Sequence, residues 1–253
     1  MKNSQLIIFF AIVLTIYSSV NIYIFFKGYH AVPAFNRNRG IYLIFFLILS
    51  LSFIAGKILE ARNSSVLSDI LNITGGFWMA FMLYGFIFLI LGDLISVLLR
   101  STGVLDETSL PVWRKWYVIA VMVVSAGLIT AGFINALIPK IQRYEISIPK
   151  AAGELSEMKV AAVSDIHLGS IIRKRSIKQL SEILKSLEPD IVLLLGDIVD
   201  GEIKPVLRDD LLQYFHCPAC RAGLFAITGN HEFIGGAQQD RKSTRLNSSH
   251  TIQ

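Results

Sequence analysis

The sequence has little cysteine, which limits the sites that cysteine could build. Only two of the 253 residues are cysteines, Cys217 and Cys220, and both belong to one C-x-x-C in HCPAC. A structural zinc site needs four ligands, and the chain offers no second pair. A redox-active pair usually opens a helix after a strand, whereas this one precedes an expected strand. We therefore interpret both cysteines as small residues of a loop.

Charged side chains are also few, at 17% of the chain, and their distribution argues against a nucleic-acid partner. Residues 1–150 hold 12 lysines and arginines against 6 acidic residues, whereas residues 151–239 hold 9 against 12. The basic excess therefore lies beside apolar segments, where lysine and arginine commonly flank membrane spans. We expect no nucleic acid among the partners.

Charge is nearly absent from four long apolar runs, at residues 6–26, 41–59, 73–99 and 117–138. Each is close to or above the ~20 residues that cross a bilayer as a helix. No small-x-small cleavage site follows the first run, which favours an uncleaved span over a signal peptide. The sequence predicts four transmembrane helices within residues 1–140, embedded in the lipid bilayer, and a linker over residues 141–157.

The side of the membrane is only weakly indicated by the basic residues. The first and third connections between the runs carry six lysines and arginines. On the opposite side, Lys2, Lys57, Arg62 and three residues within 140–150 make another six. Because loops rich in lysine and arginine stay in the cytoplasm, this near balance leans only weakly toward a C-terminal region outside the cell.

Polar side chains are rare inside the runs, and Asp93 is the one acid among them. An ionisable residue within a span is a candidate functional site. Asp93 lies seven residues before Arg100, near the end of its run, where it can bond a neighbouring helix. We favour a structural role for Asp93 and an anchoring role for the four runs. The alternative is a non-enzymatic transporter or sensor with a degenerate soluble domain.

After Pro149 the pattern changes to alternating strands and helices. Short apolar runs predict three strands, at residues 158–164, 190–195 and 223–228. The second run is continuous, which is typical of a parallel strand covered on both faces. Residues 174–188 carry apolar side chains at helical spacing, and a further short helix is expected around 207–215. This order predicts an α/β region with a parallel sheet and ligand sites at the carboxyl ends of its strands.

Polar residues follow each expected strand: Asp165 and His167, then Asp197 and Asp200, then Asn230 and His231. Carboxylate, imidazole and amide oxygen together suit a divalent transition metal. Glycines directly before Asp197 and Asn230 permit the tight turns that such ligands need. An acid after one strand is often only a helix cap, but three such groups in order predict a metal site. Glu232 is interpreted as a solvated or capping acid.

The motifs DIH, GDIVD and GNHE resemble the opening motifs of the calcineurin-like metallophosphoesterases, over roughly residues 158–236. Four spans ahead of such a domain resemble the membrane-bound bacterial members. The resemblance implies an α/β/β/α sandwich fold, a bacterial plasma-membrane location and metal-dependent hydrolysis of phosphoesters. Lipid-linked phosphoesters or pyrophosphates are the expected substrates, with a general phosphoesterase tethered to the membrane as the other possibility.

The resemblance also implies a two-metal site of manganese, iron, zinc or similar ions. Asp165 and His167 would hold the first ion, Asp197 would bridge both, and Asn230 would hold the second through its amide oxygen. A hydroxide between the ions would attack phosphorus in line.

Two further residues take catalytic roles in the same resemblance. His231 would stabilise developing charge and protonate the leaving oxygen, and Asp200 would orient His231 by a hydrogen bond. Lys204 and Arg208 are left open between contact with a phosphate and a plain surface role.

The chain departs from the family after His231. Members supply further ligands from a later isolated histidine and a Gly-His-x-His motif, and neither follows here. The stretch DRKSTRLNSSH resembles translated sequencing-adapter DNA, so residues 240–253, which include His250, are expected to be a non-native tail. Residues 158–239 would then be the first half of the domain, and this chain would bind metal poorly and be inactive.

Overall fold

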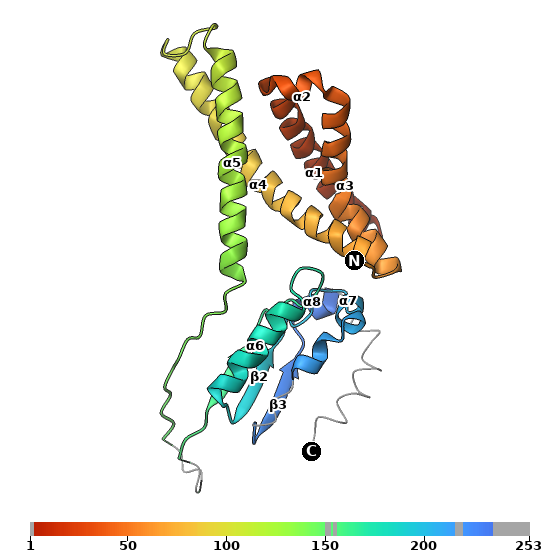
Figure 1. The fold of residues 1–253 in the computed structure, drawn as a ribbon, viewed down its shortest axis with the longest axis vertical. Coiled ribbons are helices and arrows are strands. Elements are labelled where there is room, and N and C mark those ends of the chain that lie inside the picture. Colours follow the sequence, from red (N-terminus) through yellow and green to blue (C-terminus); the bar gives the residue numbers. More distant parts are fainter. Residues whose placement is uncertain (1–2, 150–152, 154–155, 216–219, 235–253) are drawn as a thin grey trace. The chain divides into compact units, whose positions relative to one another are not determined.

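The computed structural model describes residues 3–149, 153, 156–215 and 220–234, and it contains two compact units. One unit comprises residues 1–56 and 71–136, and the other comprises residues 57–70 and 137–253. Figure 1 shows long helices in the first unit and a small sheet with short helices in the second.

Four long helices make up most of the first unit, and they contain the four apolar runs except for the last two residues of the run 117–138. The helices are α1 (Asn3–Ala31), α3 (Arg39–Arg62), α4 (Val66–Ser101) and α5 (Leu110–Ala136), with the short α2 (Pro33–Arg37) after α1. All four are long and apolar enough to cross a membrane, as predicted. Large apolar side chains such as Ile41, Val97 and Val123 are exposed on them, which suits contact with lipid tails.

Asp93 connects three of these helices. Its carboxylate accepts hydrogen bonds from the Tyr23 hydroxyl of α1 at 2.7 Å and from the Tyr117 hydroxyl of α5 at 2.8 Å. Lys27 of α1 forms an ion pair with the same carboxylate. These contacts account for an acid within an apolar helix and agree with the structural role favoured for Asp93.

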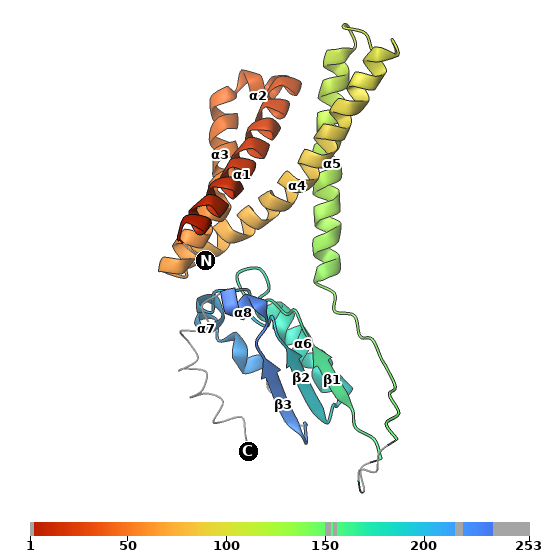
Figure 2. The same cartoon turned by 180° about the vertical axis from the view of Figure 1, so that it is seen from behind.

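The sheet of the second unit has three parallel strands in the order β1, β2, β3 (Figure 2). The strands are β1 (Val160–Val163), β2 (Ile191–Leu195) and β3 (Gly223–Ile227). Val160 pairs with Ile191, and Ile191 pairs with Gly223, so the strands begin and end together. All three predicted strands are confirmed. The first is three residues shorter than predicted, and the other two are each shorter by one residue.

Helix α6 (Lys174–Leu187) lies on one face of this sheet, where Leu184 packs with Val192 and Leu194 of β2. The helical stretch expected around 207–215 is divided into α7 (Lys204–Arg208) and a 3-10 helix, η1 (Leu211–Tyr214). The last described element is α8 (Asn230–Ile234).

The prediction that β2 is covered on both faces is wrong for the described residues. Val192 and Leu194 are buried beneath α6, whereas Leu195 is half-exposed. On the neighbouring strand Phe225 and Ile227 are exposed as well. The described elements cover only one face of the sheet. The continuous apolar run of β2 therefore predicted more burial than these elements provide.

Two expectations concern residues outside the described ranges. Residues 240–253, the expected non-native tail, lie among them. Cys217 does too, whereas Cys220 is described and is disulfide-bonded. Cys220 thus lies in a loop as expected, and its disulfide bond is a feature that the sequence interpretation did not include.

Candidate metal centre

Three loops at one edge of the sheet carry the expected site residues. The loops begin after Val163, Leu195 and Ile227, the last residues of the three strands. Parallel strands that start together end together, so the side chains that follow them converge. The sheet thereby brings residues from sequence positions 165 to 231 to one edge.

Main-chain hydrogen bonds join the first two loops. The N–H of His167 donates to the carbonyl of Asp197 at 2.9 Å, and the N–H of Leu168 donates to the carbonyl of Ile198 at 2.7 Å. The N–H of Asp200 donates back to the carbonyl of Leu168 at 2.9 Å. The two loops are paired beyond the strands, which fixes the spacing of His167, Asp197 and Asp200.

Three expected metal ligands have left-handed backbone conformations. The φ angles of Asp165, His167 and Asp197 are 56°, 51° and 50°. Such a conformation costs a non-glycine residue about 1–3 kcal/mol and is concentrated at functional sites. The strain at all three positions indicates that the backbone of these loops is shaped to place the three side chains.

The two glycines before Asp197 and Asn230 are required for different reasons. Gly196 has a φ of +87°, which glycine adopts readily. A Cβ atom on Gly229 would lie only 2.2 Å from Asp197 Oδ1. The expected need for glycine is confirmed at both positions, but Gly229 serves close approach to a carboxylate rather than an unusual φ.

Asp165, His167 and Asp197 form one candidate metal-binding group. One ligand atom from each lies within 4.8 Å of the others, and His167 Nε2 is 3.8 Å from Asp165 Oδ1. All three side chains are at least partly exposed, so a cation can reach them. Two carboxylates and one imidazole are a suitable donor set for manganese, iron or zinc.

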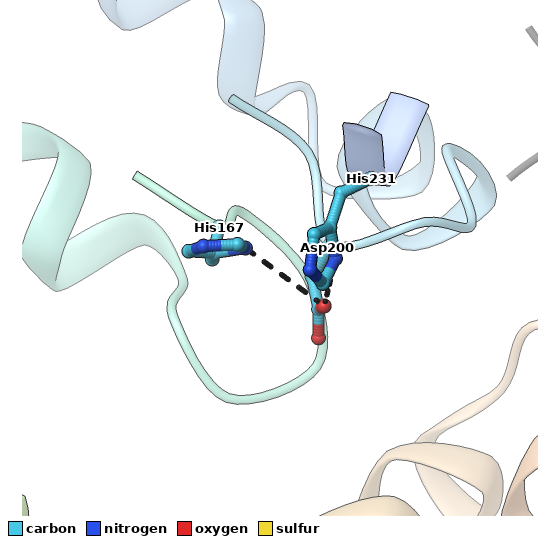
Figure 3. Close-up of side chains that lie close together, drawn as sticks. All are labelled: His167, Asp200 and His231. Atoms are coloured by element: carbon cyan, nitrogen blue, oxygen red, sulfur yellow. Dashed lines mark ion pairs between the residues drawn. The ribbon is translucent and has the colours of Figure 1, made fainter. Parts of the chain in front are cut away.

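A second group brings Asp200 between two histidines (Figure 3). Asp200 Oδ1 is 3.2 Å from His231 Nδ1 and 4.0 Å from His167 Nδ1. The two imidazole rings meet edge to face, with centroids 4.5 Å apart. Asp200 thus lies where a carboxylate can orient His231, and it also faces the proposed metal ligand His167.

Asn230 lies against Asp197, the expected bridging ligand. With its amide nitrogen turned inward, Asn230 donates to both carboxylate oxygens of Asp197, at 3.2 and 2.8 Å. With its amide oxygen turned inward, two acceptors face each other, an arrangement that a shared cation would stabilise. The Asp197 carboxylate also accepts a hydrogen bond from the main-chain N–H of His231 at 2.9 Å, so α8 is tied directly to this expected ligand.

Glu232 has a role that the sequence interpretation underestimated. Its carboxylate accepts the N–H groups of Asp197, Val199 and Gly229, at 3.1, 2.9 and 2.7 Å. Partial burial acts to raise the pKa of Glu232, but the backbone donors prevail and the pKa lies below its usual value. The bond to Gly229 is the expected cap, whereas the other two bonds join the second loop to α8. The E of the motif GNHE was the sequence signal for this anchor.

Comparison with known proteins matches residues 158–251 to the calcineurin-like phosphoesterases. An uncharacterised metallophosphoesterase of Campylobacter jejuni is 26% identical over 234 residues, which cover 92% of this chain and 61% of that protein. A transmembrane protein with metallophosphoesterase domain from Bos taurus is 30% identical over 135 residues, which cover 53% of this chain and 29% of the bovine protein.

A third relative is the UDP-2,3-diacylglucosamine pyrophosphatase of Chlamydia trachomatis, 28% identical over 122 residues. The alignment covers 47% of this chain and 36% of the chlamydial enzyme. The chain thus spans less than two thirds of the length of each of these relatives. No solved structure matches it.

Proposed function

We propose that the chain, whose residues 158–251 match the calcineurin-like phosphoesterases and which has four helices able to span a membrane, is a membrane-anchored, metal-dependent hydrolase of phosphoesters. The observation that carries this proposal is the convergence of Asp165, His167, Asp197 and Asn230 at one edge of the sheet. We take residues 158–239 as the extent of the domain.

The donor set fits two divalent cations that share Asp197. Asp165, His167 and Asp197 would hold the first cation, and Asp197 with Asn230 would hold the second. When bound, manganese, iron or zinc would supply Lewis acidity that neutralises phosphate charge and acidifies a water molecule. The described side chains give the second cation fewer ligands, so we expect it to bind more weakly than the first.

His231 is the proposed proton donor to the leaving oxygen. Its Nδ1 faces Asp200, which leaves Nε2 as the ring nitrogen that can meet the substrate. The side chain is 36% exposed, so a phosphoester can approach it. Asp200 acts on the reaction through His231, because it fixes the ring in one orientation.

A lipid-linked phosphoester or pyrophosphate is the proposed substrate. Two observations support it: the four apolar helices belong to the same chain, and one relative is named as a pyrophosphatase of a diacylated sugar nucleotide. We propose a bacterial plasma membrane as the location, with the domain outside the cell. The near balance of basic residues gives this orientation only slight support.

The test is hydrolysis by the protein produced from its native gene and placed in lipid nanodiscs with Mn²⁺. Bis(p-nitrophenyl) phosphate and a diacyl lipid with a pyrophosphate linkage are assayed side by side. We expect metal-dependent hydrolysis that Asp197→Asn abolishes and that Glu182→Gln, an exposed position on α6, leaves unchanged. No hydrolysis by the wild type, together with no effect of Asp197→Asn on the phenotype, would instead favour a non-enzymatic transporter or sensor. Preference for the soluble ester would contradict the lipid substrate.

A further inference from the structure

The segment 57–70, which comprises the end of α3, residues 63–65 and the start of α4, belongs to the same compact unit as the metal-site loops. It contains two buried acids, Glu60 and Asp69, each with only 2% of its surface exposed. Acidic side chains are almost never fully buried unless they are paired. Their partners therefore show what this segment does.

Asp69 pairs with two arginines that follow the first and second metal-site loops. Its Oδ2 is 3.0 Å from Arg173 Nη1 and 2.6 Å from Arg208 Nη2. Both arginines also bond Asp209, so two acids and two arginines form a closed group. Arg173 precedes α6 and Arg208 ends α7, so Asp69 holds the segments that leave both metal-site loops. Arg208 thus has an ion-pairing role rather than a free position beside a phosphate.

Ser170 connects the same acids to the first metal-site loop. Its hydroxyl oxygen is 3.0 Å from Glu60 Oε1 and 3.1 Å from Asp69 Oδ1. Ser170 follows His167 by three residues and is itself buried. The hydroxyl lies between two carboxylates more than a hundred positions away in the sequence.

The path from Ser170 to the metal site is short and tightly packed. Leu168 is fully buried, and its carbonyl accepts the N–H of Asp200. A Cβ atom on Gly169 would lie 3.2 Å from Asp200 Cβ, so no side chain separates these loops. Movement of residues 168–173 would therefore displace both His167 and Asp200.

We infer that Glu60 and Asp69 are positioning residues for the metal centre, because they hold the loop of His167, and through it the paired loop of Asp200, by way of Ser170 and Arg173. The effect of this positioning on catalysis rests on the proposed function. The positioning itself is a property of the metal-free protein. The end of α3 and the start of α4 thus become a structural part of the site. Residues that support metal ligands commonly change metal affinity by about 10–100-fold when they are lost.

The test compares Asp69→Asn with Glu107→Gln in the protein produced from its native gene, in nanodiscs. Glu107 is the matched control, because it is an exposed acid paired with Arg100 in another connection between apolar helices. In the metal-free protein we expect the amides of Leu168 and Asp200 to exchange about 10-fold faster in Asp69→Asn. We expect Mn²⁺ affinity, followed by electron paramagnetic resonance, to fall about 10–100-fold in Asp69→Asn and to stay unchanged in the control.

A milder variant, Ser170→Ala, is measured with the same two readouts in case Asp69→Asn loses its helical circular dichroism. Unchanged exchange at Leu168 and Asp200 in the folded variants overturns the inference, as does wild-type Mn²⁺ affinity and spectrum. If the wild type itself binds no Mn²⁺, the proposed function fails, and the exchange comparison still decides the positioning role.

Discussion

Asp200 Oδ1 lies 3.2 Å from His231 Nδ1, although the two residues follow different strands and are 31 positions apart in the sequence. The distance is short enough for a hydrogen bond that selects which ring nitrogen faces outward. It also ties the second loop of the site to α8. We therefore propose that Asp200 and His231 form a pair whose function can be separated from metal binding.

The first prediction concerns this pair in the protein produced from its native gene. His231→Ala should lower kcat about 10²–10⁴-fold, which is the usual contribution of general acid catalysis, with little change in Mn²⁺ affinity. Asp200→Asn should lower kcat in the same direction but by less, because the imidazole remains. Steady-state kinetics and a metal titration on the same samples check both. A large loss of Mn²⁺ affinity in His231→Ala would instead make His231 a metal ligand.

The second prediction concerns the ligands of the two cations. Asp197→Asn should weaken binding at both proposed positions, because its carboxylate lies in the three-residue group and against Asn230. Asn230→Ala should weaken only the second, looser binding event. Calorimetric titration with Mn²⁺ separates these outcomes by the number of binding steps. Two intact steps in Asp197→Asn would contradict a shared ligand.

The third prediction follows from Gly229. Gly229→Ala would place a Cβ atom 2.2 Å from Asp197 Oδ1 and 2.5 Å from its backbone nitrogen, so the loop must shift. Overpacking of this kind costs about 1–3 kcal/mol, and we expect Mn²⁺ binding to be lost with it. Gly127→Ala is the matched control, because no atom lies within 4 Å of its added Cβ. Retained metal binding in Gly229→Ala would show that close approach is not needed here.

The fourth prediction concerns pH and Asp209. Burial acts to raise the pKa of Asp209, but bonds from Arg208 and Arg173 prevail and hold it below its usual value. A carboxyl whose folded pKa is depressed stabilises the fold above its unfolded pKa of about 3.9 and loses that effect as pH falls toward the folded pKa.

Asp209→Asn should therefore lower stability by about 1.5–3 kcal/mol at neutral pH, as expected for bonds to charged groups. The difference from the wild type should shrink as pH falls below about 4. Thermal unfolding in nanodiscs at a series of pH values measures it. A difference that stays constant to pH 3 would show that the charge of Asp209 does not stabilise the fold.

Local patterns predicted much of the fold and of the site. The helix at 174–187 and the three strands follow from the spacing of apolar side chains within each segment, and that spacing is fully visible in sequence. The convergence of Asp165, Asp197 and Asn230 followed from one rule, that parallel strands present their carboxyl ends together.

Contacts between distant segments could not be predicted in the same way. Nothing near Asp69 in sequence indicates Arg173 or Arg208, because their meeting depends on how residues 57–70 pack within the second unit. Glu232 was underestimated for a related reason. Two of its three backbone partners lie more than 30 positions earlier.

The strand order has a consequence for how the site is assembled during synthesis. Because β1, β2 and β3 are adjacent in the order in which they are translated, β1, α6 and β2 can pair as a right-handed unit before β3 leaves the ribosome. Asp165, His167 and Asp197 all belong to that early unit. The proposed ligands of the first cation can therefore be in place while Asn230 and His231 are still being added.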